Sequence, residues 1–166
     1  MKTKHFSKFL ILLSLAFLNL GISAQENGNF GTYLVGKYDL RKANTIISII
    51  NPTGHELYVF IALLDDNENM QQCLYEYLSP NDLVELNMKQ MLKKSDSIQF
   101  GVVKVISLKD KKLDPRNVVP GVVGFQQHFY GRGCFRSGIT ESNMAAVPNA
   151  ILEEEIKILL KKCDRR

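Results

Sequence analysis

Short apolar runs separated by turn residues make up most of the chain. Residues 32–40 alternate between apolar and polar side chains, and residues 45–51 are rich in β-branched isoleucine. Residues 56–64 carry apolar side chains on both faces, which predicts a central strand that is covered on both sides. Further strand-like runs lie at 70–78, 83–88, 98–108 and 118–130. Seven short strands with turns between them are typical of a β-sandwich or barrel.

The last of these runs, residues 118–130, carries a pattern that predicts which way its side chains point. Alternation places Val123, Phe125 and Phe129 on one face, which we expect to lie toward the core. The polar alternates are expected to point outward: Gln126, His128 and Tyr130.

The carboxyl end of the chain predicts an amphipathic helix over residues 150–162. Asn149 stands at the position of a cap, and acidic residues at the start and lysines at the end suit the helix dipole. Apolar residues recur at helical spacing, so the helix should dock on the sheet. The stripe consists of Leu152, Ile156, Leu159, Leu160 and Cys163. The expected fold is therefore mainly β, a single β-sandwich of about seven strands with one C-terminal amphipathic helix.

The amino terminus has the three parts of a secretory signal peptide. A basic start containing Lys2, Lys4 and Lys8 precedes an apolar run over residues 9–20 and a small residue at Ala24. The run is too short to span a membrane, which takes about 20 apolar residues. We expect three segments: a signal peptide at 1–24, a loose leader at 25–30 and the β-sandwich domain at 31–166.

Removal of this signal changes the charge balance. The whole chain has 21 Lys and Arg against 17 Asp and Glu, and residues 1–24 hold three of the basic side chains and none of the acidic ones. The rest of the chain therefore has 18 against 17, a net charge of +1. A nearly neutral domain gives no support for binding to nucleic acid or to an anionic membrane. No membrane span is expected after signal removal.

The layout of strands and turns resembles immunoglobulin-like domains of exported bacterial proteins. The resemblance rests on Ile49-Ile50-Asn51-Pro52-Thr53, Leu63-Leu64-Asp65-Asp66 and Leu78-Ser79-Pro80-Asn81-Asp82, and it covers about the middle third of the chain after residue 24. The paired core cysteines and the tryptophan of antibody domains are missing. The resemblance implies a structural or interaction module and no particular mechanism.

Three cysteines, Cys73, Cys134 and Cys163, would enter an oxidising compartment on export. An odd number allows one internal disulfide at most, and three pairings are open. We favour Cys134 with Cys163, because the first lies in a glycine-rich loop and the second ends a helix that must fold back. The alternative is three unbridged thiols that pack as small apolar side chains.

The acidic turn after residue 64 partly matches a calcium-binding loop. Asp65, Asn67, Asn69 and Glu76 fall at positions one, three, five and twelve of that pattern. Met70 replaces the glycine that the loop needs for its sharp turn, so a polar hairpin turn is the simpler interpretation. The first three residues are retained as weak candidates for a surface ion, and we expect no metal centre and no cofactor.

One pair of residues suggests catalysis. Cys134 and His128 are six residues apart, and a thiol with a neighbouring base is the minimum for covalent catalysis. No residue that would orient the histidine can be named, so we do not expect an enzyme. The outward row at 126–130, extended by Arg132 and Arg136, is instead a candidate surface for a partner.

We therefore expect an exported, non-catalytic protein-binding or structural module, such as an accessory subunit of a periplasmic or surface assembly. Its partner would be another exported protein, its location periplasmic or extracellular, and its oligomeric state is left open. The alternative is a module for a small ligand or carbohydrate that uses Tyr75, Tyr77 and Tyr130 as aromatic platforms. A cysteine-dependent enzyme is the third hypothesis.

Overall fold

The structure is a computed structural model that describes residues 30–41, 43–92, 99–130 and 138–164. The predicted signal peptide and all of the leader except Phe30 lie outside these residues. Arg132, Cys134 and Arg136 also lie outside them.

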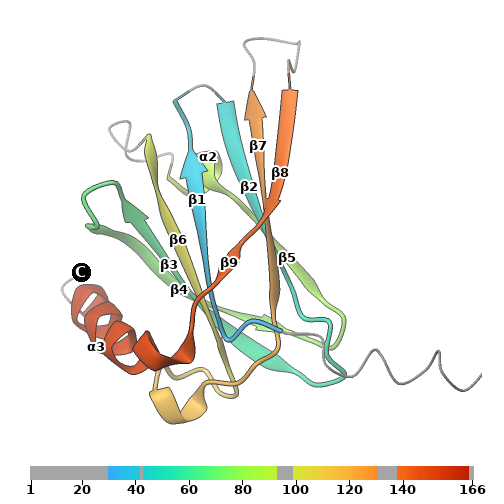
Figure 1. Cartoon of the computed structure of the whole chain (residues 1–166), viewed down its shortest axis with the longest axis vertical. Coiled ribbons are helices and arrows are strands. Elements are labelled where there is room, and N and C mark those ends of the chain that lie inside the picture. Colours follow the sequence, from blue (N-terminus) through green and yellow to red (C-terminus); the bar gives the residue numbers. More distant parts are fainter. Residues whose placement is uncertain (1–29, 42, 93–98, 131–137, 165–166) are drawn as a thin grey trace, which may run out of the picture.

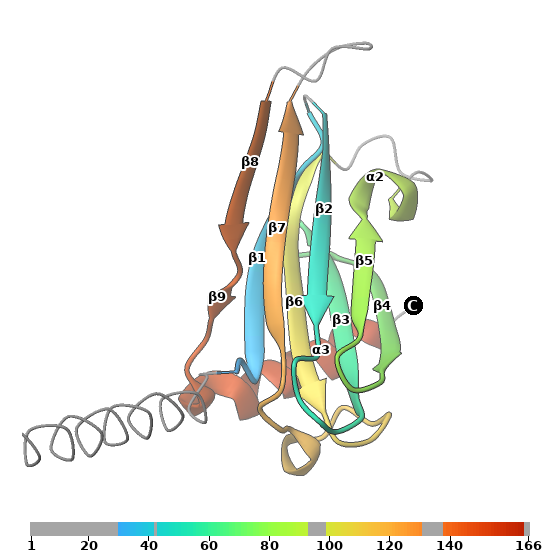
Figure 2. The same ribbon diagram turned by 90° about the vertical axis from the view of Figure 1, so that its right-hand side faces the viewer.

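Two antiparallel sheets face each other (Figures 1 and 2). Sheet one has the order β4-β3-β6-β1-β9, and sheet two has the order β5-β2-β7-β8. The strands of sheet one are β4 (Met70–Leu78), β3 (Leu57–Asp65), β6 (Phe100–Leu108), β1 (Tyr33–Asp39) and β9 (Ala145–Ala146). The strands of sheet two are β5 (Leu83–Asn87), β2 (Ala43–Ile50), β7 (Val123–Tyr130) and β8 (Gly138–Asn143).

Helical segments are few, and one of them forms a third layer. The short helix α2 (Met88–Met91) follows β5, and a 3₁₀ turn, η1 (Pro115–Asn117), lies in the loop after β6. A second 3₁₀ turn, η2 (Asn149–Ile151), leads into α3 (Leu152–Cys163). Figure 2 shows α3 behind sheet one, on the side away from sheet two. The chain is thus mainly β with one long C-terminal helix, as the sequence predicted.

Two hydrophobic cores lie on the two sides of sheet one. The core between the sheets includes Ile47 and Ile49 of β2 packed with Ile61 of β3, all fully buried. The core under α3 includes Phe60 of β3 and Ile156 of α3. Because β3 supplies side chains to both cores, the prediction of a strand covered on both faces is confirmed.

All seven predicted strands are present, but the structure adds β8 and β9. β8 begins with Gly138 and continues through polar residues, so it lacks the apolar alternation that signals a strand. β9 has only two residues. The predicted cap at Asn149 is wrong, because η2 occupies the first turn and α3 starts at Leu152 with no side-chain cap.

The predicted orientation of β7 is also wrong. Gln126 lies opposite Ile47, and His128 lies opposite Thr45, whose side chains are fully buried between the sheets. Cross-strand neighbours share one face of a sheet, so Gln126 and His128 point inward, while Val123 and Phe125 point outward. The inward face of β7 is tightly occupied from elsewhere: a Cβ on Gly124 would lie 2.5 Å from the sulfur of Met144.

Candidate functional site

The inward polar side chains of β7 protect the edge of β1. β9 pairs with β1 only at Leu34 and Val35, which leaves the rest of that edge without a neighbouring strand. The backbone N–H of Lys37 donates to Oε1 of Gln126 at 2.7 Å. Two residues further on, the N–H of Asp39 donates to Oγ1 of Thr45 in β2 at 3.0 Å. Side chains of sheet two therefore take the place of a neighbouring strand.

His128 belongs to the same group of contacts. Its Nδ1 lies 3.0 Å from Oγ1 of Thr45. Burial lowers the pKa of His128 below its ordinary value, and the negative charge of Asp39 partly opposes this shift. The imidazole is therefore a half-buried structural group, and its proposed thiol partner, Cys134, lies outside the described residues. Gln126 and His128 do not form the outward surface that the sequence predicted.

A charged pair that the sequence analysis missed closes the β1–β2 hairpin. The guanidinium of Arg41 donates from Nε and Nη2 to the two carboxylate oxygens of Asp39, at 2.9 and 2.6 Å. The same guanidinium lies 5.2 Å from the ring centroid of Phe100. These bonds lower the pKa of Asp39. The only sequence signal was an acid and a base two residues apart.

The acidic turn between β3 and β4 uses its carboxylate for structure. Oδ1 of Asp65 accepts from the backbone N–H groups of Asn67 and Asn69, at 2.9 and 2.8 Å. Oδ2 accepts from the side-chain amides of Asn69 and Gln71. Burial opposes ionisation of Asp65, but these bonds outweigh it and lower its pKa. Glu76 lies on β4 opposite Val59. Within the described residues no group of three His, Cys, Asp or Glu side chains could hold a metal ion.

The structure pairs Cys73 with Cys163, with 6.1 Å between their Cα atoms. The predicted bridge from Cys134 to Cys163 is therefore wrong. The cause is the position of α3, because its stripe of Leu152, Ile156 and Leu159 packs against sheet one and carries the last residue of the helix over β4.

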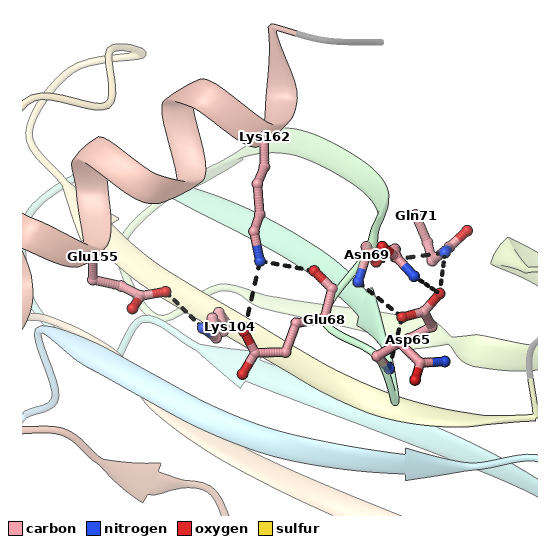
Figure 3. A network of polar contacts seen from close by, with 8 residues as sticks. Asp65, Glu68, Asn69, Gln71, Lys104, Glu155 and Lys162 are labelled. Atoms are coloured by element: carbon pink, nitrogen blue, oxygen red, sulfur yellow. Dashed lines mark hydrogen bonds and ion pairs between the residues drawn. The ribbon is translucent and has the colours of Figure 1, made fainter.

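Ionic contacts at two points also hold α3 (Figure 3). Nζ of Lys104 on β6 lies 2.6 Å from Oε1 of Glu155, and both side chains are mostly buried, with 17% and 15% exposed. Nζ of Lys162 donates to the backbone carbonyl of Glu68 at 2.8 Å and lies 3.7 Å from its carboxylate. The helix is thus fixed to sheet one by a covalent bond, an apolar stripe and charged contacts.

Two of the three tyrosines that were proposed as sugar platforms lie together. Tyr75 and Tyr77 share one face of β4, and Tyr77 contacts Tyr58 edge to face, with 5.4 Å between centroids and 62° between planes. The hydroxyl of Tyr77 donates to Glu56 at 2.8 Å. Tyr130 ends β7 in the other sheet. The rings of Tyr58 and Tyr77 are inclined to each other and so form no single flat platform.

The outer face of sheet two carries apolar side chains in adjacent rows. Ile50 lies between Leu83 of β5 and Val123 of β7, and Phe125 lies opposite Ser48 in the next row. Leu83 is 49% exposed, and the other apolar side chains are half-buried. We define the sheet-two face as the set Ile46, Ile50, Leu83, Val123 and Phe125. None of the five belongs to either hydrophobic core, and in Figure 2 no described element lies over this side of the sheet.

Comparison with known proteins supports the fold alone. No family model and no curated protein matches the chain. The fold is similar to a solved structure described as the crystal structure of Thermotoga maritima 1070, with a TM-score of 0.51 and 12% sequence identity. The match covers 73% of this chain and 97% of that chain. No helix among the described residues is long and apolar enough to cross a membrane.

Proposed function

We propose that this chain is an exported, non-catalytic β-sandwich that binds another exported protein through the sheet-two face. The observation that carries the proposal is the contrast between the two outer faces of the sandwich. α3 covers the outer face of sheet one and buries Leu152, Ile156 and Leu159 there. No described element covers the apolar side chains on the outer face of sheet two.

The sheet-two face has the composition of a protein interface. Its apolar residues adjoin polar ones on the same face, namely Ser48 and Glu85 in the row of Phe125, and Gln127 in the row of Ile46. An apolar centre with a polar rim is typical of protein–protein contacts, and contiguous exposed apolar surface commonly marks such a site. This assignment moves the expected partner surface from the inward row of β7 to its outward row.

Two features support export and a role in an assembly. The pattern of residues 1–24 is that of a signal peptide. A disulfide between Cys73 and Cys163 suits an oxidising compartment such as the periplasm or the cell surface. Together with the immunoglobulin-like strand and turn pattern, these features favour an accessory subunit of a periplasmic or surface assembly.

Crosslinking in the native host tests this proposal. The tagged chain is crosslinked mildly and purified, and the bound proteins are identified by mass spectrometry. Leu83→Lys places a charge in the sheet-two face, and Ile158→Lys is its matched control, because Ile158 is an aliphatic residue on α3 with 41% exposure. We expect one stoichiometric partner that is lost with Leu83→Lys and retained with Ile158→Lys. Recovery of the chain alone, or equal recovery with both variants, contradicts the proposal.

A second candidate function, carbohydrate binding, has one observation in its favour. Tyr58 and Tyr77 are exposed or half-exposed aromatic side chains with a carboxylate, Glu56, beside them. Aromatic rings with a polar neighbour can contact both the apolar face and the hydroxyls of a sugar. A glycan array probed with the wild-type chain and with Tyr77→Ala tests this function. Binding that disappears in the variant would support it, and no binding by the wild type would dismiss it.

A further inference from the structure

The edge strand β4 is longer and less protected than the other strand edges of the described residues. β9 has two residues, and the open part of β1 beside it is closed by the side chains of Gln126 and Thr45. β5 has five residues and runs directly into α2. β8 has six residues and begins with glycine. β4, by contrast, has nine residues and pairs with β3 on one side only.

The sequence of β4 lacks the devices that usually prevent pairing at an edge. Such strands are commonly short, interrupted by proline or rich in charge. The strand reads MQQCLYEYL, with no proline and with Glu76 as its single charged residue. Its outer face carries Tyr75 and Tyr77, a residue type that is enriched at interfaces.

We propose that β4 pairs with β4 of a second copy of this chain, in antiparallel orientation about a twofold axis at Leu74. The two five-stranded sheets then form one continuous sheet. In this register Gln72 lies opposite Glu76 of the other copy, so a neutral amide faces each of the two carboxylates. Gln71 lies opposite Tyr77, Cys73 opposite Tyr75, and Leu74 opposite itself.

The register follows from the faces of the sheet and from charge. A twofold axis perpendicular to the sheet keeps the inner face of each copy on the same side, so a residue can oppose only residues of its own face. A shift of two residues toward the carboxyl end places Leu74 opposite Glu76. A shift of four places the two Glu76 carboxylates directly opposite each other, and like charges in that position are destabilising. Charge complementarity therefore selects the register centred on Leu74.

The neighbouring elements leave room for this contact. α3 reaches β4 by the disulfide at Cys73, on the outer face of the sheet, and takes no part in the strand ladder. The inference goes beyond the proposed function, because a second copy at β4 leaves the sheet-two face free for a different partner.

Charge variants at Gln72 test both the contact and its register, because each pair occurs twice in a twofold dimer. Gln72→Glu places two carboxylates opposite each other, and Gln72→Lys places an ammonium opposite Glu76. The double variant Gln72→Glu with Glu76→Gln restores a single charge in each pair. The measurement is sedimentation velocity of the disulfide-bonded chain from residue 25 to 166 over a series of concentrations. Far-UV circular dichroism and thermal melting confirm that each variant is folded.

We expect the wild-type chain to dimerise. Gln72→Glu should raise the dissociation constant about two- to thirtyfold, and Gln72→Lys should lower it by a similar factor. The double variant should return to near the wild-type value. A wild-type chain that sediments as a monomer at the highest concentration reached overturns the inference. A dimer whose dissociation constant is the same in all three variants also overturns it, since its contact then lies elsewhere. Neither outcome depends on the pull-down with Leu83→Lys, so the two proposals can fail separately.

Discussion

At the scale of single residues, Asn51 is the amide that joins three loops at one end of the sandwich. Its side chain is fully buried. Nδ2 donates to the backbone carbonyls of His55, Leu78 and Ser79, at 2.8, 3.3 and 2.9 Å. Oδ1 accepts from the backbone N–H and the hydroxyl of Thr53. The two turns that carry the immunoglobulin-like resemblance, at 51–53 and 78–82, are therefore linked through one side chain.

Replacement of Asn51 by alanine should be strongly destabilising. The change removes both ends of this network and leaves buried carbonyl groups without a donor. We expect the free energy of unfolding to fall by about 3 kcal/mol, as measured by urea denaturation. The matched control is Ser107→Ala, because Ser107 is also fully buried but its hydroxyl has no hydrogen-bond partner among the described residues. That variant should be as stable as the wild type or slightly more so, and equal losses in both variants would contradict this account.

At the scale of elements, the disulfide gives α3 an anchor that its packing alone does not provide. Cys73 and Cys163 are 90 residues apart in the sequence. A crosslink over that length restricts the unfolded chain strongly, and chain-entropy arguments give a stabilisation of about 4 kcal/mol. The joint change Cys73→Ser and Cys163→Ser should lower the unfolding free energy by about that amount, as measured with guanidinium chloride.

Reduction provides the control for this prediction. A thiol reductant should bring the wild-type chain close to the stability of the double variant and leave the variant itself unchanged. Cys134 remains in both proteins, so its thiol does not affect the comparison. A wild-type chain whose stability is the same with and without reductant would show that the bridge does not contribute.

The elements that sequence patterns predicted well are those whose own side chains fill the core. β3 and α3 are of this kind, and both were located to within about two residues. β7 was found but its faces were reversed, because the space inside it is filled by Met144 from the β8–β9 link, beside Gly36 and Gly124. A pattern along one strand cannot indicate a side chain that arrives from another segment. The same limit applies to the disulfide, since the position of α3 over β4 depends on tertiary packing.

At the scale of the whole molecule, the two outer faces of the sandwich differ, and so do its strand edges. α3 closes one face, and side chains from sheet two close the β1 edge. What stays open is the sheet-two face and the β4 edge, which lie on different sheets. The candidate surfaces arose from burial and strand pairing, which the sequence pattern alone could not supply, since the sequence had placed the contact on the inward row of β7.

The whole molecule should also lose stability on acidification, in two stages. The pKa of His128 is lowered from its ordinary value of 6.5 by burial, so the unfolded chain binds this proton more readily than the folded one. Stability should therefore be complete above about pH 6.5 and begin to fall below it. The pKa values of Asp39 and Asp65 are also lowered, and that of Asp114 lies at about 2, so the loss should steepen below about pH 4. Urea midpoints measured between pH 8 and pH 3 record both stages. His128→Gln should remove the upper stage alone, whereas His55→Gln, a change at an exposed turn, should leave it in place. An upper stage that persists in His128→Gln would assign it to another group.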